Sequence, residues 1–224
     1  MIIKVCGMRD AENIRAVEQL VNQWSNELCS LIPLGVRIVN GQWSMMGFIF
    51  WPKSSRYVSE RPSYLPKHCK RVGVFVDADI EQIKHTVEDY ALDIVQLHGH
   101  ESPEFLCQLR SVFGHPIAII KAFNIATEDD LKATQAYEGI ADYFLFDTKG
   151  QSVGGNGEKF DWSVLDAYDG STPFLLSGGI GPDDASRVSA FHHPQCIGID
   201  LNSRFEVEPA YKDIKKLKTF LEQL

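Results

Sequence analysis

The chain has 224 residues, of which 44% are hydrophobic and 23% charged, a composition typical of one soluble globular domain with a large core. Its formal net charge of −8 and pI of about 5.3 argue against nucleic acid or an anionic membrane surface as a partner. No apolar run approaches the roughly 20 residues that span a bilayer. The chain also starts on a strand pattern instead of a signal peptide, so we expect a cytoplasmic protein with no membrane partner.

Strand and helix signals alternate along the whole chain. Short apolar segments predict eight strands, at residues 1–5, 45–50, 71–76, 93–97, 117–122, 143–146, 173–176 and 196–201. Between and after them, amphipathic patterns predict helices at 11–20, 79–90, 103–113, 127–137 and 211–223, with two more starting near Asp161 and Asp183. Eight alternating units predict an α/β fold, a (β/α)8 barrel, formed by residues 1–224 as a single domain. An open doubly wound sheet is disfavoured because no GxGxxG follows the first strand.

One segment, residues 21–42, has neither a helical nor a strand period. It falls between the first helix and the second strand, so in a barrel it would lie on the face opposite the active site, where insertions are tolerated. We expect an insertion there, either a small helix or a contact between subunits.

Two reactive side chains are expected at strand ends. Cys6 follows the first strand, near Lys4 and a helix start, and both features favour a thiolate; the alternative is a small buried core residue. Asp147 ends the sixth strand, where loss of hydration would raise its pKa and let it act as an acid. A glycine-rich loop, 154–157, follows it and would allow close backbone approach. In a barrel Cys6 and Asp147 would face each other across the mouth, as proton-transfer isomerisation requires.

Anion-binding groups are expected around the same mouth. Gly178 and Gly179 precede a helix start, and Asn202, Ser203 and Arg204 follow the eighth strand; these are the positions at which such barrels bind phosphate. Arg56 offers a planar fork suited to a carboxylate or phosphate, or is simply a solvated loop residue. The ligand is therefore expected to be a small phosphorylated molecule.

The sequence offers little support for a metal or cofactor. The five cysteines are odd in number and scattered without a CxxC pair, which predicts reduced thiols instead of disulfides or a zinc site. His98 and His100 lack a third ligand at a recognisable spacing. No cofactor motif is present, so acid–base chemistry without a cofactor is expected.

The chain resembles the phosphoribosylanthranilate isomerases of tryptophan biosynthesis. The resemblance rests on motifs in the family's order: KVCGMRD (4–10), GFIFWPKSSRYV (47–58), RVGVFV (71–76), VQLHG (95–99), FDT (146–148), GGNGEKFDW (154–162), LSGGI (176–180) and GIDLNSRFE (198–206).

The resemblance implies an Amadori rearrangement of N-(5'-phosphoribosyl)anthranilate by general acid–base catalysis. It gives Cys6 as the base at C2 of the sugar and Asp147 as the acid at the ring oxygen. It further implies that Arg56 binds the anthranilate carboxylate. The remaining contacts are Gly178, Gly179, Asn202 and Ser203 for the phosphate, and His98 and Asp200 for the sugar.

Two features depart from the family pattern. Asn202-Ser203-Arg204 stands where many members have Ser-Ser-Gly, which changes the allowed backbone angles and adds an arginine. The 21–42 segment stands where the family usually has a tight turn.

Rival functions remain open at this point, as does assembly as a monomer or a homodimer. The nearest enzymes are indole-glycerol-phosphate synthase, which should show a lysine and glutamate set at strand ends, and sugar-phosphate epimerases, which need a metal held by histidines and aspartates. A non-catalytic binder would keep the glycines without needing Cys6 and Asp147 opposed.

Overall fold

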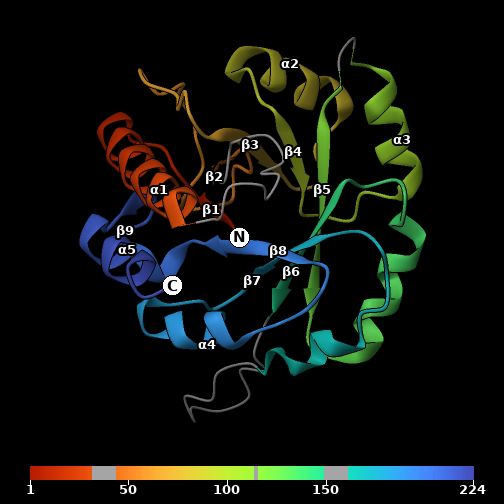
Figure 1. Ribbon diagram of the computed structural model, residues 1–224. Helices are drawn as coiled ribbons and strands as arrows, with labels where there is room; N and C mark the ends of the chain where they lie inside the picture. The colour runs from red at the N-terminus through yellow and green to blue at the C-terminus, as the bar shows by residue number, and fades with distance from the viewer. Residues whose placement is uncertain (32–43, 114–115, 149–160) are drawn as a thin grey trace.

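Eight parallel strands close into a barrel in the computed structural model, which describes residues 1–31, 44–113, 116–148 and 161–224 (Figure 1). The strands are β1 (Ile2–Cys6), β2 (Ser44–Ile49), β3 (Lys70–Phe75), β4 (Ile94–Leu97), β5 (Ala118–Ile125), β6 (Tyr143–Thr148), β7 (Phe174–Ser177) and β8 (Cys196–Leu201). Each pairs in parallel with the next and β8 pairs with β1, so the predicted (β/α)8 class is confirmed. Such closure leaves no strand edge unpaired.

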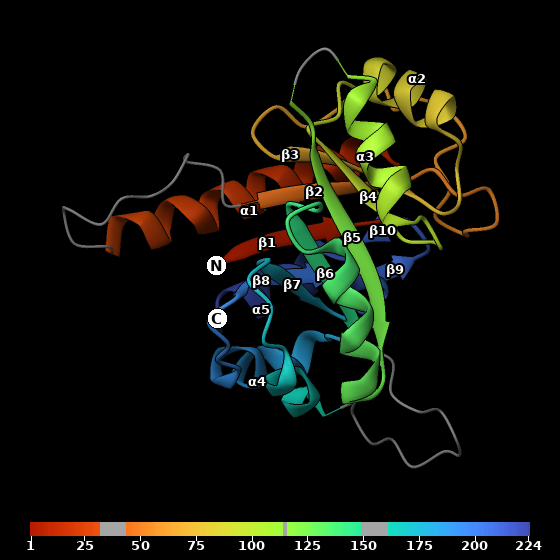
Figure 2. The ribbon, with the colours of Figure 1, turned by 90° about the vertical axis from the view of Figure 1, so that its right-hand side faces the viewer.

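Helices surround the barrel (Figure 1). They are α1 (Ala11–Leu31), α2 (Ile80–Tyr90), α3 (Pro103–Ser111), α4 (Ala185–Ala190) and α5 (Ile214–Leu221), with the 3-10 segments η1 (Glu128–Tyr137), η2 (Trp162–Ala167), η3 (Pro182–Asp184) and η4 (Ser203–Phe205). A short antiparallel pair, β9 (Glu206–Glu208) and β10 (Tyr211–Lys212), follows β8. Both chain termini lie at the end of the barrel where the strands begin, and the β9–β10 pair lies at the other end (Figure 2).

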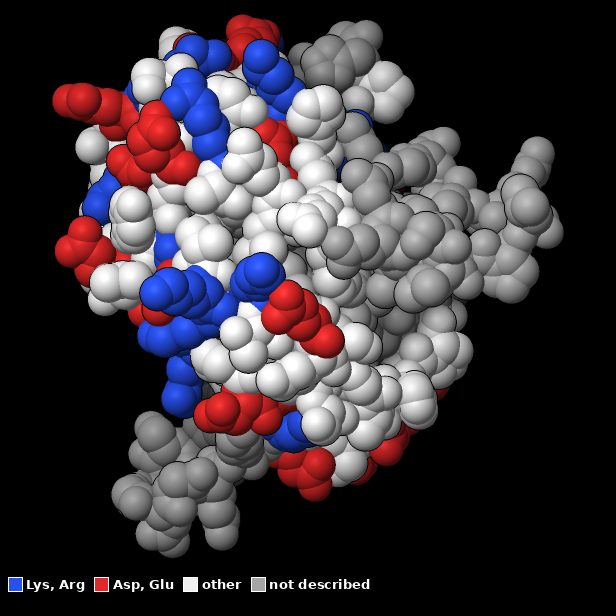
Figure 3. Space-filling model, turned by 60° about the vertical axis from the view of Figure 1, so that its left-hand side comes forward, with Lys and Arg blue, Asp and Glu red and all other residues white. Residues whose placement is uncertain are grey.

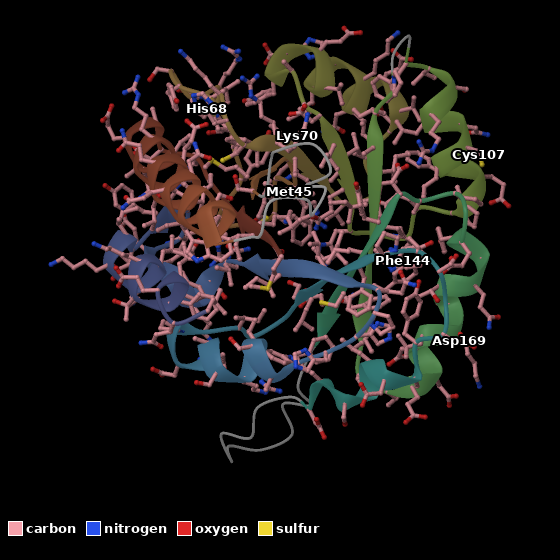
Figure 4. The ribbon with its side chains drawn as sticks, viewed as in Figure 1. Met45, His68, Lys70, Cys107, Phe144 and Asp169 are labelled. Carbon is pink, nitrogen blue, oxygen red and sulfur yellow. The ribbon has the colours of Figure 1, made fainter. Side chains whose placement is uncertain are left out.

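Alternation along each strand separates two cores. In β6, Phe144 and Phe146 face the helices, while Leu145 joins a smaller cluster inside the barrel with Met45, Val72, Ile94, Ile120, Ala122 and Leu175. Met45 and Phe144 lie among the strands, whereas Cys107 lies on the outer helix α3 (Figure 4). Because successive side chains of a strand point to opposite faces, the residue two positions after an inward apolar residue also points inward. Polar inward positions at the carboxyl ends therefore follow directly from the strand pattern.

The expected helix starts are partly confirmed. Asp10 caps α1 by accepting from the Asn13 amide at 2.8 Å, and Asp161 caps η2 by accepting from the Ser163 amide at 3.0 Å. β2 and β3 are joined by turns without a helix. Two expectations were wrong. The segment expected to be a helix at 127–137 is a 3-10 helix. The last helix begins at Ile214, not at Tyr211, because Asp213 accepts from the amides of the first turn and so caps it there.

The first helix continues to Leu31, so the first half of the expected 21–42 insertion is an extension of α1. Residues 32–43 lie outside the described residues. The position of this insertion on the face opposite the site stays a prediction.

None of the described helices combines the length and the apolar character needed to cross a membrane. On the face shown in Figure 3, Lys and Arg side chains are interspersed with Asp and Glu among the coloured residues. That face therefore carries no field of a single sign.

Glu138 joins the segment after η1 to the loop before β7. Its carboxylate accepts from Tyr168 Oη at 2.7 Å, Thr172 Oγ1 at 2.8 Å and Ser171 Oγ at 3.0 Å. Burial alone would raise the pKa of Glu138, but these hydrogen bonds outweigh it and hold the pKa below its ordinary value.

We expect Glu138→Gln to lower the free energy of unfolding by about 1–2 kcal/mol at pH 7, because hydrogen bonds to a charged acceptor are lost. The folded pKa lies below the value of the unfolded chain, about 4.3, so the stabilisation is complete above that value and disappears as the pH falls through the folded pKa. Urea unfolding at pH 7 and at pH 3 measures this, with the exposed Glu88→Gln as the matched control. If the difference in free energy of unfolding between wild type and variant were the same at both pH values, the ionised Glu138 would not be the source of the stabilisation.

Candidate active site

A cavity of about 200 Å³ opens at the carboxyl end of the barrel strands. Its lining comes from the ends of seven strands, all but β5, and the loops after them: Cys6, Ile49, Val74, Gln96, His98, Asp147, Ser177, Gly178, Gly179, Ile180, Asp200, Asn202, Ser203 and Arg204. Every predicted site residue except Arg56 belongs to this lining. Cys6 and Asp147, 141 positions apart in the chain by their numbers, thus share one cavity.

Cys6 lies at the end of β1 on the same side of the strand as Lys4, while Ile3 and Val5 face the helices. Burial raises the pKa of the Cys6 thiol, and the cations Lys4 and Lys212 act against this without cancelling it. The expectation that the lysine and the helix start would favour a thiolate is therefore outweighed by desolvation. The thiol is predominantly protonated at neutral pH, and its thiolate, once formed, is a stronger base.

Lys4 and Asp200 form a buried ion pair inside the barrel, next to Cys6. Lys4 and Asp200 are cross-strand neighbours in β1 and β8, and their Nζ and Oδ1 atoms lie 2.9 Å apart. Burial would lower the pKa of Lys4, but Asp200 and Cys6 outweigh it, so the pKa is raised and the ammonium is retained. The Asp200 carboxylate therefore lies inside the barrel against a fixed cation.

Asp147 is linked to β4 through a histidine. His98 Nε2 lies 3.6 Å from Asp147 Oδ2, and Gln96 Nε2 lies 3.2 Å from His98 Nδ1. Because Gln96 and His98 are two positions apart, both point into the barrel. Gln96 is 1% exposed, and its Oε1 is a buried acceptor with no hydrogen-bond partner among the described residues. His98 is thus held against Asp147, whose side chain remains 25% exposed toward the cavity.

His100 does not join His98. Its side chain is 96% exposed and lies 3.1 Å from Asp77 outside the cavity. The two histidines therefore diverge, and the described residues contain no group of three or more His, Cys, Asp or Glu placed to hold a metal.

The loop after β7 turns through two glycines with positive φ, Gly178 at 91° and Gly179 at 69°. Side chains at these positions would be strained, so the backbone itself forms this part of the cavity wall. The helix expected behind it begins as the 3-10 turn η3, which leads into the short α4. After β8, Ser203 and Arg204 belong to η4 and both are exposed. The glycine-rich loop 154–157 predicted to follow Asp147 lies outside the described residues.

Arg56 lies beside the cavity, not in its lining. Its Nε donates to both carboxylate oxygens of Glu206, at 2.8 and 3.0 Å, and its Nη2 donates to Oε2 at 2.6 Å. The Arg56 side chain is 22% exposed, so it is not a freely solvated loop arginine. Donating hydrogen bonds to the Glu206 carboxylate raises the pKa of Arg56.

Comparisons with known proteins agree with this geometry. Residues 35–223 match the family model described as N-(5'phosphoribosyl)anthranilate (PRA) isomerase. The chain belongs to this family. Curated PRA isomerases similar to it come from Phocaeicola vulgatus, 48% identical over all of this chain and 98% of the relative, and Parabacteroides distasonis, 46% identical over all of this chain and 93% of the relative.

Solved PRA isomerases share the fold. The enzyme of Thermotoga maritima matches with a TM-score of 0.70 and 28% identity, covering all of this chain and 98% of that one. A PRA isomerase solved in complex with reduced 1-(o-carboxyphenylamino)-1-deoxyribulose 5-phosphate matches with a TM-score of 0.68 and 27% identity over the same shares. The expected membership of this isomerase family is confirmed.

Sequence reasoning did not single out several residues that shape this PRA isomerase site. Glu206 binds Arg56 and Lys212, and Lys212 also donates to Asn202. Gln96 is hydrogen-bonded to His98. Inward alternation in β4 could have identified Gln96. Glu206 stands at the end of the GIDLNSRFE motif, but nothing local in the sequence pairs it with Arg56, 150 positions earlier.

Proposed function

We propose that this chain converts N-(5'-phosphoribosyl)anthranilate into 1-(2-carboxyphenylamino)-1-deoxyribulose 5-phosphate, the reaction for which its family is named, as a step of tryptophan biosynthesis. The observation that carries the proposal is the common cavity of Cys6, Asp147 and the Gly178–Gly179 turn. A thiol, a carboxyl group and a backbone anion cradle are the parts that an acid–base isomerisation of a sugar phosphate needs. No cofactor takes part in the proposed mechanism.

Asp147 is the proposed general acid. Its proton goes to the ribose ring oxygen as the bond from that oxygen to C1 breaks, and the nitrogen lone pair forms a C1–N iminium. Its position 3.6 Å from His98 keeps the carboxyl group at the cavity wall. The open chain then carries an acidic proton at C2.

Cys6 is the proposed general base. Its thiolate takes the C2 proton, and the C2–H electron pair forms a C1–C2 double bond while the iminium nitrogen becomes neutral. The resulting enol-amine tautomerises to the 2-ketone by moving the hydroxyl proton to C1. Lys4 and Lys212 are the cations that favour the small thiolate population against the cost of burial.

The substrate phosphate is proposed to lie on Gly178 and Gly179, with Asn202 and Ser203 across from them. Arg204 lines the same side and supplies a charge that a glycine could not. Asp200 and His98 are proposed to contact the sugar hydroxyls between the two ends. With the phosphate bound at one end of the sugar and the base Cys6 at the other, the sugar would bind in a single orientation.

We expect Arg56→Ala to raise the KM for phosphoribosylanthranilate by roughly 10–100-fold with kcat changed by only a few fold. Arg56 is proposed to bind the anthranilate carboxylate, which is present in both ground and transition states, so its loss weakens uniform binding. Steady-state kinetics measure the split, with the exposed Arg61→Ala as the matched control. An unchanged KM would mean that the carboxylate is held elsewhere.

The direct test of the function is an assay on phosphoribosylanthranilate, following the loss of its fluorescence with and without the protein. We expect turnover at protein concentrations far below that of the substrate. Binding without turnover would instead support a non-catalytic phosphate-ligand binder and refute the proposed enzyme.

A further inference from the structure

Glu206 lies at the centre of a buried charge cluster beside the active-site cavity. Its side chain is 5% exposed, and its carboxylate accepts from Arg56, from Lys212 Nζ at 2.6 Å and from the Ala210 amide at 3.2 Å. Arg56 and Lys212 each carry one positive charge and Glu206 carries one negative charge, so the cluster of three side chains has a net charge of +1. A partly buried net charge of this kind favours binding of one further anion.

Lys212 fixes the cluster to the barrel and to the site. Its side chain is fully buried, and Nζ donates to Asn202 Oδ1 at 2.9 Å as well as to Glu206. The Lys212 backbone exchanges hydrogen bonds with the Asn13 side chain, of 2.8 and 2.9 Å, which ties β10 to α1. Glu206 is therefore held on a rigid support, while Asn202 is bonded to Lys212 and not to Glu206.

Glu206 engages only one edge of the Arg56 guanidinium. The Nε and Nη2 groups point at its carboxylate, whereas the edge that carries Nη1 has no partner among the described residues. The stem of Arg56 packs on Gly7, whose φ is 78°; a Cβ at Gly7 would come within 2.7 Å of Arg56 Cδ and 2.8 Å of Asn202 Oδ1. Stem and fork are thus both fixed, and the Nη1–Nη2 edge remains for a second carboxylate, bound in a bidentate manner.

We propose that Glu206, held by Lys212, is a positioning residue that orients Arg56 and thereby sets the preference of the site for substrates whose aromatic amine carries a carboxylate. This inference rests on the proposed isomerase function. Glu206 touches no reacting atom; it acts through the guanidinium. Pre-orienting a long arginine removes part of the entropy cost of binding, and the gain is restricted to ligands that use the guanidinium.

The test compares two substrates, phosphoribosylanthranilate and the corresponding phosphoribosyl derivative of aniline, which lacks the carboxylate. In Glu206→Gln we expect the KM for phosphoribosylanthranilate to rise at least 10-fold, with kcat nearly unchanged and the kinetics on the aniline derivative unaltered. In Arg56→Ala/Glu206→Gln the KM should be no higher than in Arg56→Ala alone, because both changes remove the same contact. Glu208→Gln, on the same β-strand and exposed, is the matched control and should match wild type on both substrates.

Glu206→Asp provides a second variant that keeps the charge for Lys212 but shortens the reach to Arg56. We expect an intermediate rise in KM for phosphoribosylanthranilate only, and circular dichroism checks that each variant is folded. Equal losses on both substrates, or a lower KM in Glu206→Gln, would overturn the positioning role. Turnover of neither substrate by wild type would refute the proposed function itself, and this inference with it.

Discussion

Cys6→Ala is expected to lower kcat on phosphoribosylanthranilate by at least about 100-fold, the usual contribution of a general base. The thiol is 3% exposed and lies between Lys4 and the cavity, so its removal leaves no other thiol among the residues described there. The methyl group of alanine fits the vacated space, and the melting temperature should change little. Steady-state fluorescence kinetics and thermal denaturation measure the two effects separately.

The pH dependence of this variant distinguishes a base from a packing residue. Burial raises the pKa of Cys6, so the thiolate fraction, and with it kcat/KM of wild type, should grow as the pH rises above neutrality. The residual activity of Cys6→Ala should lack that rise. Cys107→Ala, on the exposed side of α3, is the control and should keep the wild-type profile. Near-normal turnover by Cys6→Ala would exclude Cys6 from the mechanism.

Much of the fold follows from local sequence because strand alternation and helix caps act over a few residues. The inward direction of Lys4 and Cys6 is fixed as soon as Ile3 and Val5 are assigned to the helix side. Closure of eight such strands then brings their carboxyl ends together, which is why the strand-end residues could be assigned to one cavity before any coordinates.

What could not be predicted depends on long-range contacts. Whether burial or the nearby cations dominate at Cys6 depends on how completely the barrel excludes water, which no local pattern encodes. Arg56 follows β2 and its partner Glu206 follows β8, on opposite sides of β1 in the barrel. Only closure of the barrel brings them together. The two-residue strand β10 was mistaken for the start of a helix because three lysines and apolar residues at helical spacing follow it directly.

Asp147→Asn is expected to reduce kcat by at least about 100-fold while KM changes by only a few fold. Asparagine keeps the shape and the contact with His98, but its amide cannot donate a proton to the ring oxygen at a useful rate. The same kinetic assay measures the loss. Asp142→Asn is the matched control, because Asp142 precedes the same strand, binds Arg110 and lies away from the cavity lining. Its effect should fall on stability and not on kcat.

The alternative acid in the cavity is His98, and the pair of variants Asp147→Asn and His98→Asn decides between them. Among the described side chains of the lining, Asp200 is ion-paired with Lys4 and Cys6 is the proposed base, which leaves His98 and Asp147 as the candidate acids. If Asp147 is the acid, His98→Asn should cost far less than Asp147→Asn, since it removes only a neighbour 3.6 Å away. If His98→Asn lost more activity than Asp147→Asn, the general acid would be the His98 imidazole. Gln96 would then fix its tautomer and Asp147 would orient it.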